Sequence, residues 1–306
     1  MIYIKIFFIK LKFSKNKFYS KILSKPSLNV VDYIQKYKYI FDIEVNTKTV
    51  SGYENVIWTC WFQGKENAPP IIKCAMNTMS KYNSKHPIIV ITEQNLNKYI
   101  ELPSFIKDKY DKKIISRTHL SDYVRVCLLA KYGGVWVDAS CYFTNKIPDI
   151  IWKIPFFQFK NSHWFALKEI PNSVIWKLID RYYNQKIFEH TRSNWFLRAK
   201  PNSAIINKMK QLLEEYWKYE NTLIDYFIFH YFLTFVIKND KFSQKEFNKI
   251  PQKYNNVYPH LLQNAFSEEF NEKILLQIKK NSFVHKLKWQ EVKSSNKNDF
   301  LAYLLA

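Results

Sequence analysis

Apolar and polar positions in the first half of the chain follow the periods of strands and helices in turn. VIWTCWF (residues 56–62) and HPIIVIT (86–92) are apolar, β-branched or aromatic runs of strand length. Between them, apolar residues three or four apart follow two prolines, which suits the first turn of a helix. These apolar positions are Ile71, Ile72, Ala75, Met76 and Met79. The order strand, helix, strand predicts a parallel sheet.

A second helix–strand unit follows at residues 118–138. THLSDYVRVCLLAKYGG predicts a helix capped by Thr118 or Ser121 and ended by Gly133 in the left-handed conformation. VWV then predicts a short strand, after which comes Asp138. Ligands of parallel sheets bind at the carboxyl ends of strands, so Asp138 lies where chemistry is expected.

The half of the chain after residue 150 is less regular. Residues 154–159 and 282–289 read as strands, and 173–183, 205–219 and 223–237 as helices. We find no internal repeat and no low-complexity linker. The expected fold class is therefore α/β, with a Rossmann-like, mostly parallel sheet flanked by helices. A helical N-terminal segment and helical C-terminal additions complete it.

Charge separates the first 50 residues from the rest. The chain carries a formal net charge of +21, and its first 25 residues hold seven lysines and no acid. This basic, mostly helical segment fits contact with an anionic membrane surface. A segment that is merely packed, or poorly ordered, explains it equally well. The longest apolar run, residues 224–237, is too short to span a bilayer and predicts a buried helix.

Composition also excludes some classes. The four cysteines form no C-x-x-C pair, which indicates reduced thiols and a cytoplasmic protein. The basic surface attracts polyanions. However, the sequence holds no helix-turn-helix, zinc finger or RNA-binding motif. We therefore expect no nucleic-acid partner, and a basic nucleic-acid-binding protein is the least favoured alternative.

Candidate chemistry centres on Asp122, Arg125 and Asp138. Asp122 and Arg125 are three apart and share a helix face that points toward the strand end carrying Asp138. On spacing alone, a solvated surface ion pair explains Asp122 and Arg125 better. Asp225 and His230 fall in the apolar run 223–237, where they either contact a ligand or form a structural hydrogen-bond network.

The order of these pieces resembles a known family. SDYVRVCLLAKYGGVWVDAS (121–140) resembles the S-D-x-x-R-x-x-x-L-x-x-x-G-G-x-x-x-D-x-D core of the Asp-x-Asp sugar transferases, a GT-A group related to glycosyltransferase family 32. With VIWTCWFQGKENAP (56–69) and VHKLKW (284–289), the chain resembles the bacterial capsular polysaccharide synthesis protein family more closely. Ser140 stands where the second aspartate is expected.

The resemblance implies a GT-A-like catalytic domain over residues 51–306, with a donor-binding half at about 55–165 and an acceptor-binding, helical half at about 166–306. It implies catalytic roles for Asp122, Arg125 and Asp138. The implied donor-binding residues are these three with Trp61, Gln63, Gly134 and Lys286. The implied ligands of Mn²⁺ or Mg²⁺ are Asp138, Ser140 and His285, and the implied sugar or acceptor contacts are Asn161, Asp225 and His230.

The expected activity is transfer of a sugar from a nucleotide-diphosphate donor, a UDP-sugar in the first instance. The acceptor would be a growing surface polysaccharide, of capsule or lipopolysaccharide type, carried on a lipid at the cytoplasmic face of the membrane. Retention of configuration is implied by the resemblance. A diphosphate leaving group needs a cation, either a divalent metal or Arg and Lys side chains. Ser140 also leaves open a catalytically inactive relative that binds a nucleotide sugar.

Overall fold

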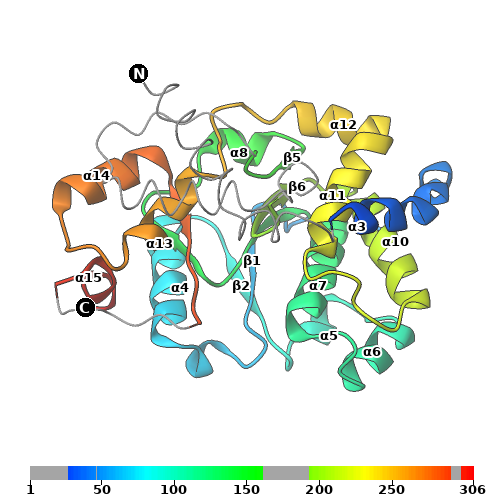
Figure 1. Cartoon of the computed structure of the whole chain (residues 1–306), viewed down its shortest axis with the longest axis horizontal. Coiled ribbons are helices and arrows are strands. Elements are labelled where there is room, and N and C mark those ends of the chain that lie inside the picture. Colours follow the sequence, from blue (N-terminus) through cyan, green and yellow to red (C-terminus); the bar gives the residue numbers. More distant parts are fainter. Residues whose placement is uncertain (1–26, 46, 161–192, 291–297) are drawn as a thin grey trace, which may run out of the picture.

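A five-stranded sheet forms the centre of the molecule (Figure 1). The computed structural model describes residues 27–45, 47–160, 193–290 and 298–306. The strands are β1 (Ile57–Cys60), β2 (Ile88–Ile91), β3 (Gly134–Val137), β5 (Phe156–Phe157) and β6 (Phe196–Ala199). In the order β2-β1-β3-β6-β5, β1 pairs in parallel with both neighbours, and β6 runs antiparallel to both of its own. The mostly parallel α/β sheet predicted from the sequence is thereby confirmed.

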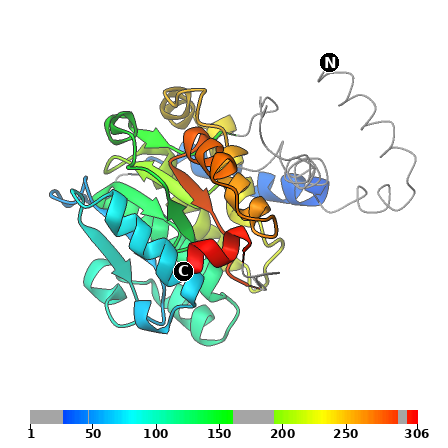
Figure 2. The same ribbon diagram turned by 90° about the vertical axis from the view of Figure 1, so that its left-hand side faces the viewer.

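Helices cover both faces of this sheet. On one side, α4 (Pro70–Tyr82) packs with α13 (Leu261–Ala265), α14 (Glu272–Asn281) and α15 (Phe300–Leu305) around a smaller apolar core. Figure 2 shows α15 against α4 on the outside of the sheet. On the other side, α7 (Arg117–Tyr132), α10 (Ala204–Tyr219) and α11 (Ile228–Asn239) enclose the main core with the strands. Other helical segments are η2 (Lys65–Asn67), α5 (Leu96–Tyr99), α6 (Ser104–Asp111), α8 (Asp149–Lys153), α12 (Lys241–Asn248) and η4 (Tyr258–His260).

The described part of the N-terminal segment is helical and packed. It forms α3 (Ser27–Tyr33) and η1 (Ile34–Asp42), whose apolar side chains enter the main core beside α10 and α11. Tyr37 lies edge-on to Phe232, with 6.0 Å between ring centroids. Residues 1–26, which carry most of the predicted membrane-contacting stretch, lie outside the described residues, as does the predicted helix 173–183. None of the helices described is both long and apolar enough to cross a membrane.

The two consecutive glycines join α7 to β3 at a crowded point. Gly133 ends the helix, as predicted, but its φ of +69° and ψ of −153° lie outside the left-handed helical conformation that was expected. Its carbonyl accepts a hydrogen bond from Trp58 Nε1 at 2.9 Å. Gly134 has φ +92°, and a β-carbon there would lie 2.5 Å from the carbonyl oxygen of Val56. Gly134 therefore lets the backbone of β3 approach that of β1.

The other end of α7 differs from the prediction. Ser116 caps the helix by accepting a hydrogen bond from the backbone N–H of His119, whereas Thr118 and Ser121 lie within the helix. Ser121 donates its hydroxyl to the carbonyl of Thr118. The cap lies two residues before Thr118 and five before Ser121, so the helix begins earlier than predicted.

A two-stranded antiparallel ribbon brings distant parts of the chain together. After Asp138, a turn leads into β4 (Cys141–Phe143), which pairs with β7 (Val284–Lys286). The register places Lys286 opposite Cys141. As a result, a lysine from the last part of the sequence reaches the end of β3.

Candidate active site

The middle of α7 is buried and delivers an ion pair into the interior. Asp122 and Arg125 are only 5% and 3% exposed, and Arg125 Nη2 lies 3.1 Å from Asp122 Oδ1. Asn194 ties the pair to the strand side, since its backbone carbonyl accepts from Arg125 Nη1 at 2.6 Å and its amide donates to Asp122 Oδ1 at 3.1 Å. This is a buried, hydrogen-bonded pair, not the solvated surface pair that spacing alone favours.

Asp138 links this pair to the solvent. Its Oδ1 accepts from Trp136 Nε1 at 2.9 Å and lies 3.3 Å from Arg125 Nη2. Its Oδ2 accepts from Lys286 Nζ at 2.8 Å. Asp122, Arg125, Asp138 and Lys286 thus form one chain of alternating charges at the carboxyl end of β3, which we call the charged cluster.

Ser140 belongs to the same arrangement. Its hydroxyl accepts a hydrogen bond from Lys286 Nζ at 2.7 Å, and its backbone carbonyl accepts from the N–H of Leu287 at 3.0 Å. The Lys286 ammonium therefore lies between the side chains of Asp138 and Ser140. These are the first and last positions of the Asp-x-Ser sequence.

The pKa values of the two carboxylates in the charged cluster are shifted in opposite directions. Burial acts to raise the pKa of Asp138, but the Lys286 ammonium and the Arg125 guanidinium outweigh it and hold that pKa below its ordinary value. Burial raises the pKa of Asp122 to about 6; Arg125 opposes this shift and the charge of Asp138 adds to it. Asp138 is therefore ionised throughout the neutral range, whereas Asp122 exchanges its proton near pH 6.

Asp122 should make the stability of the protein depend on pH. A carboxyl whose pKa is raised on folding stabilises the folded state least when it is ionised, so its contribution falls as pH rises toward about 6. Relative to Asp122→Asn, the wild-type free energy of unfolding should drop by about 1–2 kcal/mol between about pH 5 and about pH 7.5. Urea unfolding of both proteins across this range measures the difference. A difference that does not change with pH would contradict the raised pKa.

His285 does not join the charged cluster. Successive residues of a strand face opposite sides, so Lys286 faces Asp138 while His285 faces the core. The imidazole is fully buried, its Nε2 lies 3.2 Å from Thr144 Oγ1, and burial lowers its pKa to about 3. The expected ligand set of Asp138, Ser140 and His285 is therefore not assembled. Its spacing in the sequence could not reveal which face of β7 each side chain takes.

The charged cluster does not fit a divalent metal ion. A hard cation such as Mg²⁺ or Mn²⁺ takes several oxygen ligands, mostly anionic. Here both oxygens of Asp138 face cationic or N–H donors, and Ser140 is neutral and already accepts from an ammonium. Across the part of the chain that the structure describes, no group of three or more His, Cys, Asp or Glu side chains could hold a metal.

Trp61 and Gln63 follow β1 at the same edge of the sheet. The Trp61 indole is half-buried and lies edge-on to Trp289, with 5.4 Å between ring centroids. Its Nε1 is buried and finds no hydrogen-bond partner among the described residues. Gln63 is exposed. Both lie at the carboxyl end of β1, which is parallel to β3, and within the described residues neither side chain is hydrogen-bonded to the charged cluster.

The three expected sugar contacts have different outcomes. His230 lies in the first turn of α11, next to Phe229, whose ring lies beside the Arg125 guanidinium. Burial and, to a smaller extent, the charge of Arg125 lower the pKa of His230 to about 3. Asp225 precedes α11 and does not lie on it, and its carboxylate accepts from the backbone N–H of Phe227 at 2.6 Å. That contact is a local turn, so the prediction of a buried helical Asp225 is wrong. Asn161 lies outside the described residues.

Several residues around Arg125 were not predicted from the sequence. Its guanidinium carbon lies 4.9 Å from the ring centroid of Trp136 and 5.3 Å from that of Phe229. Asn194 also contacts the guanidinium, because its backbone carbonyl accepts a hydrogen bond from Arg125 Nη1. Trp136 could have been found, because alternation along β3 places it on the same face as Asp138. Asn194 and Phe229 have no spacing signal, since they arrive from remote parts of the chain.

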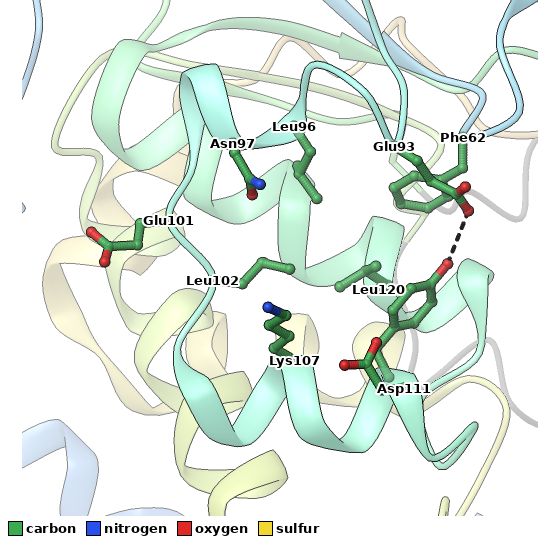
Figure 3. Close-up of a pocket in the computed structure, with 10 residues that line it drawn as sticks. Phe62, Glu93, Leu96, Asn97, Glu101, Leu102, Lys107, Asp111 and Leu120 are labelled. Carbon is green, nitrogen blue, oxygen red and sulfur yellow. Dashed lines mark hydrogen bonds between the residues drawn. The ribbon is translucent and has the colours of Figure 1, made fainter.

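A separate pocket of about 520 Å³ lies beyond the ends of β1 and β2 (Figure 3). Its lining includes the carboxylates of Glu93, Glu101 and Asp111, and the ammonium of Lys107. Tyr110 donates to Glu93 at 3.3 Å, as Figure 3 shows. With three acids to one base, this pocket is a poor site for a phosphate, and no member of the charged cluster lines it.

Comparison with known proteins identifies the family to which this chain belongs. A curated relative, the O-glycosyltransferase braB of Annulohypoxylon truncatum, is 24% identical over 106 residues, which are 31% of this chain and 25% of that protein. The chain therefore matches only about a quarter of that relative's length. Among solved structures, the PaToxG glycosyltransferase aligns with 84% of this chain and 97% of its own, at 10% identity and a TM-score of 0.35. The family model described as capsular polysaccharide synthesis protein matches residues 10–304, and the chain belongs to that family.

Proposed function

We propose that this protein is a glycosyltransferase that takes a sugar from a nucleotide-diphosphate donor at the charged cluster. The observation that carries the proposal is the paired arrangement of two carboxylates and two cations at the carboxyl end of β3, where ligands of such sheets bind. The cations suit the charge of a diphosphate, and the carboxylates suit the hydroxyls of a sugar or ribose.

Three members of the charged cluster, Asp138, Lys286 and Arg125, have distinct roles in this proposal. Asp138 and Lys286, with side chains 22% and 25% exposed, are the two that a donor can reach. Asp138 accepts hydrogen bonds from donor hydroxyls, and Lys286 attracts the diphosphate. The buried Arg125 positions both carboxylates and adds positive charge behind them. Trp61 offers an apolar ring near this edge for the nucleotide base.

We propose that the acceptor is a growing surface polysaccharide carried on a lipid. The description of the family, capsular polysaccharide synthesis, supports this proposal. The basic N-terminal segment would hold the enzyme at the inner, anionic face of the cytoplasmic membrane. Transfer from a UDP-sugar with retention of configuration completes the proposal, on the family resemblance.

Donor hydrolysis tests this proposal directly. UDP-, GDP- and CMP-sugars should be screened for a rise in melting temperature and for release of the nucleotide. With the donor so found, Asp138→Asn should lower the rate of nucleotide release about 100-fold, because the donor loses one charged hydrogen-bonding partner. Asp149→Asn, in an exposed ion pair with Lys146, is the matched control and should keep the wild-type rate. Equal rates for Asp138→Asn and wild type would refute the assignment.

Ser140 favours one other function, a nucleotide-sugar-binding protein without catalysis. In that case a donor raises the melting temperature but no nucleotide is released above the background of the Asp138→Asn protein. The same screen therefore separates the two functions, because binding and turnover are read independently.

A further inference from the structure

We propose that the Lys286 ammonium is the cation that binds the donor diphosphate, and that this protein therefore binds and uses its donor without a divalent metal ion. This inference rests on the proposed function and names the group that supplies positive charge to the diphosphate at the same site. It starts from the disagreement between the residues at the end of β3 and the requirements of a metal site.

The position of the ammonium is built into the fold. The β4–β7 ribbon sets Cys141 opposite Lys286, and the backbone N–H of Leu287 donates to the carbonyl of Ser140 at 3.0 Å. This register places Nζ 2.8 Å from Asp138 Oδ2 and 2.7 Å from Ser140 Oγ. Lys286 thus occupies the space between the two side chains that would otherwise face a shared ion.

The hydrogen-bonding capacity of Lys286 leaves room for a ligand. An ammonium carries three N–H donors. Within the described parts of the chain, two of them are directed to Asp138 and Ser140. With a quarter of the side chain exposed, the third can reach a phosphate oxygen from the solvent side.

The serine at position 140 fits this role. The charged cluster has two positive and two negative side chains when Asp122 is ionised, so its net charge is zero. A carboxylate at position 140 would make the net charge −1 and would repel a diphosphate. A hydroxyl orients the ammonium without adding negative charge, which keeps Lys286 available to an anion.

Lys286 also suits this task better than Arg125. The Arg125 side chain is 3% exposed, and its Nη1 and Nη2 are engaged with Asn194, Asp122 and Asp138.

During transfer, the bond between sugar C1 and the diphosphate oxygen breaks and its electron pair goes to the diphosphate. The acceptor hydroxyl oxygen forms the new bond to C1 and releases its proton to the solvent. Lys286 stabilises the departing diphosphate by charge and keeps its own proton.

The test compares binding of diphosphate and monophosphate in the full-length protein. UDP, GDP, CDP and ADP are titrated calorimetrically in EDTA and in Mn²⁺, and the nucleotide that binds best is then compared with its monophosphate. We expect equal wild-type affinity for the diphosphate in both buffers. Lys286→Met should weaken diphosphate binding about 10- to 100-fold and monophosphate binding less. Lys288→Met removes the same charge from an exposed position two residues on and should bind as wild type does.

The outcomes separate this inference from the proposed function. Wild-type binding that disappears in EDTA overturns the inference and leaves the glycosyltransferase proposal intact. So does an equal loss of diphosphate and monophosphate affinity in Lys286→Met, because a purely structural lysine would affect both alike. No binding of any nucleoside diphosphate in either buffer would instead remove the proposed function itself.

Discussion

Replacing Arg125 by methionine should lower the free energy of unfolding by about 3–5 kcal/mol and abolish donor turnover. The guanidinium lies 3.1 Å from the Asp122 carboxylate and 3.3 Å from that of Asp138. Without it, nothing opposes the effect of burial on the pKa of Asp122, and Asp138 keeps one cation, Lys286, at the outer end. The cost is large because Asp122 is almost fully buried and would lose its only oppositely charged partner among the described residues.

Chemical denaturation and the nucleotide-release assay measure both effects. Arg117→Met is the matched control, since Arg117 is the first residue of the same helix. Its ion pair with Glu93 spans 3.1 Å between side chains that are 55% and 50% exposed. That variant should change the free energy of unfolding by about 0.5 kcal/mol or less. If Arg125→Met cost no more than Arg117→Met, the buried pair would not support the structure as described.

Gly134→Ala should destabilise the protein by about 3 kcal/mol or more without touching a charged group. The added β-carbon would lie 2.5 Å from the carbonyl oxygen of Val56 and 3.1 Å from Trp58 Nε1. That carbonyl accepts the backbone hydrogen bond of Val135, so relieving the clash means separating β1 from β3. The end of β3 carries Asp138, so donor turnover should fall as well.

Gly52→Ala is the control that separates the cost of backbone strain from the cost of the steric clash. Gly52 has the same φ of +92°, but a β-carbon there would meet no atom within 4 Å. Its cost should therefore be the backbone strain alone, about 1 kcal/mol. Thermal and urea unfolding of the two variants give the difference. If both variants lost equal stability, the close approach of the two strands would have no energetic importance.

The elements with strong local signals could be predicted from the sequence. The strand at 88–91 and helix α10 have apolar patterns that neighbours in the fold only reinforce. Boundaries were harder, because capping depends on single hydrogen bonds. Ser116 caps α7 two residues before Thr118 and five before Ser121. The predicted helix 223–237 starts at Ile228, after the turn made by Asp225.

The candidate site, too, could be predicted from the sequence only in part. Asp122, Arg125 and Asp138 could be predicted to lie together, because one helix and the next strand carry them within 17 positions of the sequence. The position of Lys286 depends on the register of β7 against β4, and a shift of one residue would have presented His285 instead. Pairing between strands so far apart in the sequence is set by tertiary packing, which a local pattern does not encode.

The β4–β7 ribbon also determines when the site can exist. Asp138 and Lys286 are 148 positions apart, so a growing chain completes β1, β2 and β3 long before its lysine is synthesised. Until β7 has emerged from the ribosome and paired, the Asp138 carboxylate lacks its outer cation and the diphosphate lacks the ammonium proposed to bind it. If the proposed function is correct, donor use requires a chain in which β7 has emerged and paired with β4, and chains that lack this pairing cannot use the nucleotide sugar.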